Sequence, residues 1–189
     1  MGRPVEFIHS EVIDKAVDAF WRDGYEAISA NELADAMGVA KSSLYNSYGS
    51  KKGVLLHAIE HYSGELSEHV RSLGRAGNLA SSLRELIIDM TVEPASEHGC
   101  LLVNMTTELG ARDQEVRECV QEGFSTVQKS FAVLLKAAQK EGLLNDDLDP
   151  QSYALSLVTG IAGIRVLAKS GFTRKQLSPF VDLLLSKLK

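Results

Sequence analysis

The chain has 189 residues, enough for one or two domains with a buried core that needs no disulfide framework. Two cysteines and no charged-then-apolar leader argue against secretion, so we expect a cytoplasmic protein without a disulfide. No apolar run reaches the roughly 18 residues of a membrane span. The formal net charge of −5 argues weakly against a polyanionic partner for the surface as a whole.

The first elements are three helices. Apolar side chains recur at helical spacing over residues 10–24, which end in a glycine. A short helix follows over residues 29–38, where Ser29 and Glu32 have the spacing of a capping box. A third helix covers residues 40–48 after a glycine-containing turn. Two short helices joined in this way are typical of a helix-turn-helix.

The rest of the chain also has the pattern of helices. Only four prolines, abundant helix-forming residues and no long alternating stretch favour an all-α fold. Asp149 before Pro150, and Thr173 three residues before Gln176, indicate the starts of the last two helices. We expect about nine helices, the last six over residues 51–73, 79–91, 99–110, 113–142, 150–171 and 174–189.

An acid-free patch covers residues 38–52, which contain three lysines, although residues 1–52 carry six basic and eight acidic side chains. The second helix of a helix-turn-helix enters the major groove. Val39, Leu44 and Tyr48 are expected to pack against the first helix. The outward side chains are then short hydroxyls, an amide, a phenol and a cation, which suit phosphate oxygens and base edges, whereas an acid would repel phosphate. These outward residues are Lys41, Ser42, Ser43, Tyr45, Asn46 and Ser47.

The stretch FWRDGYEAISANELADAMGVAKSSLYNSYGSKKGVLLHAIEHY closely resembles the amino-terminal pattern of the TetR/AcrR family of bacterial transcriptional regulators. The resemblance is specific over residues 10–62 and looser afterwards, where GCLLVNMTTELG and GIRVLAKSG also look similar. It implies a homodimeric regulator, usually a repressor, released from a palindromic operator by a small effector. It also implies a DNA-binding head over residues 1–50, a connector helix over about 51–74, and a ligand-sensing and dimerisation domain over 75–189.

The resemblance also implies contacts with DNA. The chain differs from many members of the family around Asn46 and Ser47, where they carry an aromatic residue or a histidine. It also differs at Lys52, where they carry an acid. The operator sequence is therefore not transferable, and Lys52 is a candidate phosphate contact. Arg3 is compatible with a minor-groove arm or with a disordered terminus. The implied phosphate contacts are Ser29, Tyr45 and Lys51, and the implied base or groove contacts are Asn31, Lys41, Ser42, Ser43 and Asn46.

Regulation is expected to pass through the helix over residues 51–73 from a mostly apolar effector pocket. Asn104, Thr107 and Arg165 are candidate polar contacts there, although each could equally cap or cross-link helices. Small residues in YALSLVTGIAGIRVLA, followed by the apolar FVDLLLSKL, predict that the last two helices pair with their copies in a second subunit.

The two cysteines differ in position. Cys100 follows a glycine at the start of a predicted helix, where backbone N–H groups and the helix dipole favour a thiolate that reacts with electrophiles and oxidants. Lys169, on a helix expected to pack nearby, would stabilise this thiolate further through its positive charge. The preferred alternative is a buried, inert Cys100, and Cys119 in mid-helix is also expected to be inert.

Other functions have weaker support. The chain has no phosphate-binding glycine loop and no nucleophile elbow, and neighbours such as His98 and Cys100 seldom form a catalytic dyad, so we expect no enzyme. His57 and His61 have the spacing of zinc ligands but lack an evident third ligand, so we expect no metal and no cofactor. A helical adaptor with a vestigial DNA-binding head is the remaining alternative.

Overall fold

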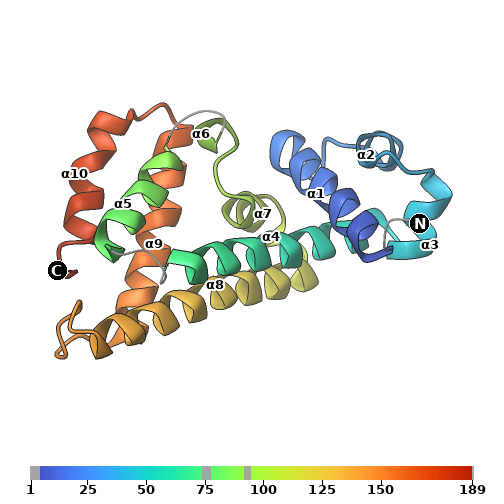
Figure 1. Ribbon diagram of the computed structural model, residues 1–189. Coiled ribbons are helices and arrows are strands. Elements are labelled where there is room, and N and C mark those ends of the chain that lie inside the picture. Colours follow the sequence, from blue (N-terminus) through green and yellow to red (C-terminus); the bar gives the residue numbers. More distant parts are fainter. Residues whose placement is uncertain (1–4, 74–77, 92–94, 189) are drawn as a thin grey trace. The chain divides into compact units, whose positions relative to one another are not determined.

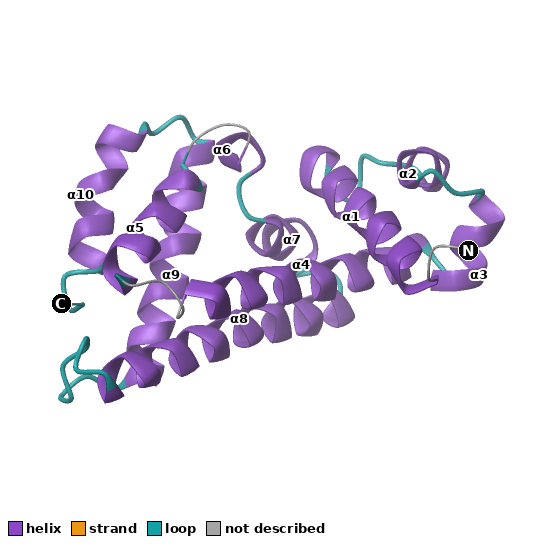
Figure 2. Ribbon diagram, viewed as in Figure 1, coloured by secondary structure: helices purple, strands orange, loops and turns teal. Residues whose placement is uncertain are grey.

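The fold is all-α, as the sequence predicts (Figures 1 and 2). The computed structural model describes residues 5–73, 78–91 and 95–188, so Arg3 lies outside the described residues. These ranges contain the nine expected helices and one further helix of four residues, α6. The helices are α1 Val5–Asp23, α2 Ala30–Met37, α3 Lys41–Tyr48, α4 Lys51–Leu73, α5 Leu79–Asp89, α6 Ala95–His98, α7 Leu101–Leu109, α8 Gln114–Lys140, α9 Pro150–Lys169 and α10 Arg174–Leu184.

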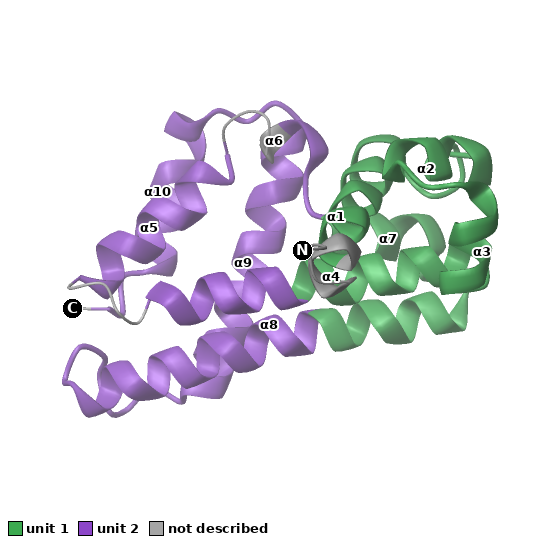
Figure 3. Ribbon diagram, turned by 45° about the vertical axis from the view of Figure 1, so that its right-hand side comes forward, with its two compact units in different colours: residues 1–63, 101–123 green, residues 64–100, 124–189 purple. Residues whose placement is uncertain are grey.

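The helices gather into two compact units (Figure 3). Unit 1 comprises residues 1–63 and 101–123, and unit 2 comprises residues 64–100 and 124–189. Helices α4 and α8 each contribute to both units. These units are defined by their packing and not by their function. The assignment of residues 1–50 to DNA binding and of residues 75–189 to sensing and dimerisation stays a prediction.

Unit 1 is built on the apolar faces of α1, α2, α3 and the first part of α4. Phe20, Leu33, Leu44 and Ile59 have no exposed side-chain surface and form its centre. Burial of such side chains contributes roughly 1.5–3 kcal/mol each relative to exposure. The short helices α2 and α3 therefore owe their stability to packing, because helices of this length are marginal in isolation.

Unit 2 has its own apolar core between α5, α9, α10 and the second part of α8. The predicted caps are present: Asp149 accepts a hydrogen bond from the backbone N–H of Ser152 at 2.9 Å, and Gln176 Oε1 accepts one from the backbone N–H of Thr173 at 2.9 Å. Residues Leu83, Ile87, Phe131 and other large apolar side chains fill the centre.

Helix α9 is the one described helix that is long and apolar enough to cross a membrane, by length and composition alone. It contains no uninterrupted apolar run of 18 residues, because polar and charged side chains such as Thr159 and Arg165 interrupt it. The core helices of soluble proteins pass the same test, and α9 buries seven residues in unit 2, Arg165 among them. Its composition is thus that of a core helix and is weak evidence for a membrane.

Candidate nucleic-acid interface

The helix-turn-helix forms at the predicted residues. Helix α2 ends at Gly38, whose φ of 72° is left-handed and therefore suited to glycine. The backbone N–H of Val39 donates to Ala34 O at 3.0 Å and closes the turn before α3. Leu44 is fully buried, whereas Val39 and Tyr48 are half-buried, so the inner side of α3 is the predicted one.

The outer side of α3 is exposed along its whole length. The Lys41 ammonium lies 6.0 Å from the centre of the Tyr45 ring, which is 42% exposed. Ala40, at the N-cap, has no side-chain acceptor for the first backbone N–H groups of α3, and helix starts of this kind favour anions. The exposed residues are Lys41, Ser42, Ser43, Tyr45, Asn46 and Ser47, and Asn31 of α2 is exposed as well.

Ser29 has a structural task in addition to its predicted contact with phosphate. Its hydroxyl oxygen accepts a hydrogen bond from the backbone N–H of Glu32 at 3.2 Å, and Glu32 Oε2 accepts one from the backbone N–H of Ser29 at 2.8 Å. The interactions with Ser29 lower the pKa of Glu32. The hydroxyl of Ser29 also hydrogen-bonds to the Glu32 carboxylate, so a phosphate contact from the exposed Ser29 would compete with Glu32 for this proton.

Lys51 is half-buried and is held by the chain itself. Its ammonium donates to the backbone carbonyls of Tyr25 at 2.7 Å and of Ile28 at 2.8 Å, and lies 4.2 Å from the centre of the Tyr25 ring. An ammonium has three N–H donors. A phosphate contact from Lys51 would therefore use the third donor.

Lys52 lies in an ion-pair network in unit 1. Its ammonium is 2.6 Å from Glu115 Oε2 and 3.3 Å from Asp113 Oδ2. The hydrogen bond to Glu115, followed by that to Asp113, raises the pKa of Lys52. These acids compensate the charge of Lys52, so Lys41 is the exposed cation of the acid-free patch. Sequence reasoning missed this pairing because the acids lie about 60 residues farther along the chain.

The predicted effector residues are distributed over both units. In unit 2, Cys100 and Arg165 are buried, and Arg165 Nε donates to the Gly99 carbonyl at 2.8 Å. In unit 1, Asn104 is half-buried, and the exposed Thr107 donates its hydroxyl to the Asn104 carbonyl at 2.8 Å. Arg165 and Thr107 thus have intramolecular partners, and their contact with an effector stays a prediction.

Both cysteines are free thiols. The Cys119 sulfur lies 3.6 Å from the Leu56 carbonyl, and burial raises the pKa of this thiol to about 11. Cys119 is therefore protonated at neutral pH, which agrees with the inert role predicted for it. Cys100 is buried and directly precedes α7.

Two histidines of α4 contact other groups. His57 Nδ1 lies 2.9 Å from the Gly53 carbonyl, and His61 Nε2 lies 2.6 Å from Asp14 Oδ1 on α1. Among residues 5–73, 78–91 and 95–188, no three His, Cys, Asp or Glu side chains come together as metal ligands.

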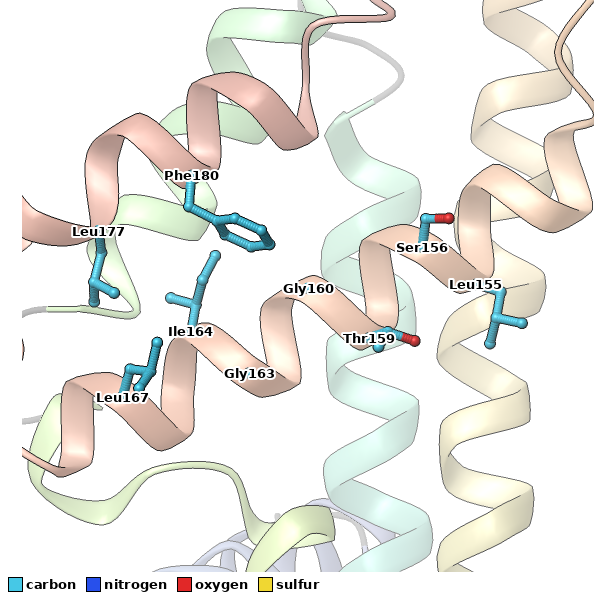
Figure 4. A pocket seen from close by; sticks show the side chains of 9 residues that line it. All are labelled: Leu155, Ser156, Thr159, Gly160, Gly163, Ile164, Leu167, Leu177 and Phe180. Carbon is cyan, nitrogen blue, oxygen red and sulfur yellow. The ribbon is translucent and has the colours of Figure 1, made fainter.

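Helices α9 and α10 carry an open apolar groove of about 550 Å³ in unit 2 (Figure 4). Phe180 of α10 and Leu167 of α9 are 44% and 40% exposed, and nothing lies within 4 Å of where a Gly163 side chain would begin. The groove is lined by Leu155, Ser156, Thr159, Gly160, Gly163, Ile164, Leu167, Leu177 and Phe180.

Two family models match this architecture. Residues 12–58 match the bacterial regulatory proteins of the tetR family, and residues 80–176 match the tetracyclin repressor-like C-terminal domain. The chain belongs to the TetR family. It is therefore a DNA-binding transcriptional regulator and not an enzyme.

Bacterial transcriptional regulators are similar to this chain over nearly its whole length. The HTH-type transcriptional regulator YezE of Bacillus subtilis (strain 168) is 27% identical over 193 aligned residues that cover all of both chains. The HTH-type transcriptional repressor ComR of Escherichia coli (strain K12) is 24% identical over 181 residues, 93% of this chain and 86% of that one. A cysteine mutant of CifR complexed with 26-bp double-strand operator DNA has a TM-score of 0.77 and 27% identity and matches all of both chains.

Proposed function

We propose that this protein is a cytoplasmic, ligand-responsive repressor that binds a palindromic operator as a homodimer. The observation that carries the proposal is the exposed outer side of α3, which holds hydroxyls, an amide and Lys41 but no acid. Similarity to ComR, which is named a repressor, and to CifR, whose structure contains operator DNA, supports it. In this proposal residues 1–50 form the DNA-binding head, α4 is the connector, and residues 75–189 sense the effector and dimerise.

The proposed DNA contacts divide by chemistry. Ser29, Tyr45 and Lys51 bind phosphates, which fixes the position of α3 without reading sequence. The first turn of α3 reaches base edges, as recognition helices do. The residues proposed to read bases or the groove are Asn31, Lys41, Ser42, Ser43 and Asn46. Ser47 and Lys52 are further candidate DNA contacts, and Lys52 would have to exchange an ion pair with Asp113 or Glu115 for one with phosphate.

The proposed homodimer uses the α9–α10 groove. Leu155, Phe180 and Leu183 are 53%, 44% and 68% exposed, and large exposed apolar patches mark interaction sites. Gly163 lets another helix approach closely because it carries no side chain. A second copy presents the same groove, so pairing about a two-fold axis covers both apolar surfaces at once.

The proposed effector is a small apolar or electrophilic molecule. It shifts the protein away from DNA only if it binds the DNA-released form better, and α4 carries the change. Cys100 and Arg165 are the candidate contacts in unit 2, and Asn104 and Thr107 are those in unit 1. Arg165 would have to exchange its bond with the Gly99 carbonyl for one with the effector.

Selection of duplexes from a random DNA pool by the purified protein tests the proposal. We expect an inverted repeat whose half-sites lie about one helical turn, roughly 34 Å, apart. A reporter with this sequence in its promoter is expected to be repressed by the protein. A pool that yields no common sequence would instead favour the helical adaptor with a vestigial DNA-binding head.

A further inference from the structure

A carboxylate from α7 binds the loop that precedes the helix-turn-helix. Glu108 Oε2 accepts a hydrogen bond from the backbone N–H of Tyr25 at 3.1 Å, and Glu108 Oε1 accepts one from the backbone N–H of Glu26 at 2.7 Å. The partners are more than 80 residues apart in sequence and belong to unit 1. Each oxygen thus takes one of two consecutive amides, and such charge-assisted bonds are stronger than neutral ones.

Gly24 makes room for this carboxylate. Its φ of +79° is left-handed, and a Cβ at this position would lie 3.2 Å from Glu108 Oε2. The turn brings the amides of Tyr25 and Glu26 toward one anion. The glycine therefore serves both the backbone conformation and the close approach of Glu108.

Lys51 of α4 binds the carbonyls of the same loop. Its two acceptors belong to Tyr25 and Ile28, so Tyr25 has its N–H bound by the α7 carboxylate and its C=O by the α4 ammonium. Ile28 directly precedes Ser29, the N-cap of α2. Glu108 thus binds the start of the loop between α1 and α2, and Lys51 binds both its start and its end.

The turn after α7 is also bound to the start of α4. Asp113 and Glu115 pair with Lys52, and Asp113 Oδ1 accepts hydrogen bonds from the backbone N–H groups of Glu115 at 3.0 Å and Val116 at 3.2 Å. Asp113 is therefore itself held at the start of α8. Residues 108–115 contact the helix-turn-helix head and its connector at two separate points.

We propose that Glu108 is a positioning residue for DNA binding. It holds the loop at Tyr25 and Glu26, and through Ser29 it sets where α2 begins and how α2 and α3 are presented. The end of α7 thereby belongs to the structure that positions the DNA-binding helices. A movement of α7 would change the position of α2 and α3 through Glu108, without a movement of α4. This inference rests on DNA binding and does not depend on an effector, a homodimer or repression.

The test replaces Glu108 and measures DNA binding by fluorescence anisotropy. The probes are a duplex selected from a random pool by the wild-type protein and a shuffled duplex of equal length. We expect Glu108→Ala to lower affinity for the selected duplex at least about tenfold, because two charge-assisted bonds are lost, and to affect the shuffled duplex less. Glu108→Gln should lie between, since its amide keeps one acceptor.

Amide hydrogen exchange separates positioning from general stability. The amides of Tyr25 and Glu26 should exchange faster in Glu108→Ala, while those of the buried Phe131 and Leu135 in unit 2 stay as in the wild type. Glu85→Gln on α5 is a matched control, because this exposed carboxylate lies in unit 2. It should change neither readout.

Two outcomes would overturn the inference. One is a folded Glu108→Ala variant that binds the selected duplex within twofold of the wild type. The other is unchanged exchange at Tyr25 and Glu26. If Glu108→Ala does not fold, Glu108→Gln decides on the same two readouts. If the wild type selects no duplex, the proposed function fails, while the exchange measurement still decides whether Glu108 holds the loop.

Discussion

Two exposed helical surfaces differ in what they offer a partner. The outer side of α3 carries hydroxyls, an amide and a lysine, whereas the groove of α9 and α10 carries leucines, an isoleucine and one phenylalanine. Each helix also has a buried side, represented by Leu44 in α3 and Leu157 in α9, both without exposed surface. An ordinary solvent-facing helix surface mixes acids and bases. The outer side of α3 lacks acids, which favours a partner rich in phosphate. The α9–α10 groove lacks most charge, which favours an apolar partner.

The largest expected effect comes from a charge in the α9–α10 groove. Gly163→Glu should convert the dimer to a monomer and lower operator affinity at least about a hundredfold, because two linked heads bind far more tightly than one. The protomer should not lose stability, since Gly163 is exposed with open space beside it, and glycine in a helix interior costs about 1 kcal/mol relative to alanine. Light scattering and anisotropy measure the two changes.

Ala137→Glu, on the exposed side of α8, is the control for this charge and should leave the dimer intact. A wild-type protein that is monomeric at micromolar concentration would contradict the proposal that the α9–α10 groove binds a second copy of the chain.

The second effect concerns the buried side of α3. Leu44→Ala should lower the free energy of unfolding by about 2–5 kcal/mol, because it leaves a cavity in the core of unit 1. Ser47→Ala, on the exposed side of the same helix, should change it by less than about 0.5 kcal/mol. Chemical denaturation measures both. Equal changes would contradict the assignment of inner and outer sides.

The third effect separates two neighbours on the outer side of α3. Asn46→Ala should relax base preference by about 1–3 kcal/mol at one position, because an amide can bind a base edge through two hydrogen bonds. Tyr45→Phe should weaken binding to all sequences by about 0.5–1.5 kcal/mol, the value of one lost hydrogen bond. Binding to a set of singly substituted operators distinguishes them, and identical profiles would contradict the division of roles.

The smallest effect concerns Cys119. With a pKa of about 11, only about one thiol in ten thousand is ionised at pH 7. Maleimide labelling of Cys119, followed by mass spectrometry, should be slow at pH 7 and rise about tenfold per pH unit toward pH 11. Because burial disfavours the thiolate in the folded state, the free energy of unfolding should fall as the pH rises from about 9, the ordinary value for a thiol, toward 11.

Cys119→Ser should leave DNA release by electrophiles unchanged, whereas Cys100→Ser should abolish it if Cys100 is the sensor. Rapid labelling of Cys119 at pH 7 would show that its surroundings are more open than the structure indicates.

Local features of the fold were predictable because their determinants lie close together in sequence. Ser29 and Glu32 are three residues apart, as are Thr173 and Gln176, and both pairs form the expected caps. Helix α6 was missed because four residues are too few to show a period. The outer side of α3 was predictable for the same reason as the caps, since one helical turn decides which of its side chains share a side.

The sequence by itself determined the helices, the helix-turn-helix and the acid-free side of α3, because helical period and capping act over three or four residues. Only the tertiary structure decided that Lys52 lies against Asp113 and Glu115, and that Lys51 and Glu108 bind the same loop between α1 and α2. Such pairs form between residues about 20 to 80 positions apart in the chain. Packing of the helices brings them together, and no local pattern records that packing.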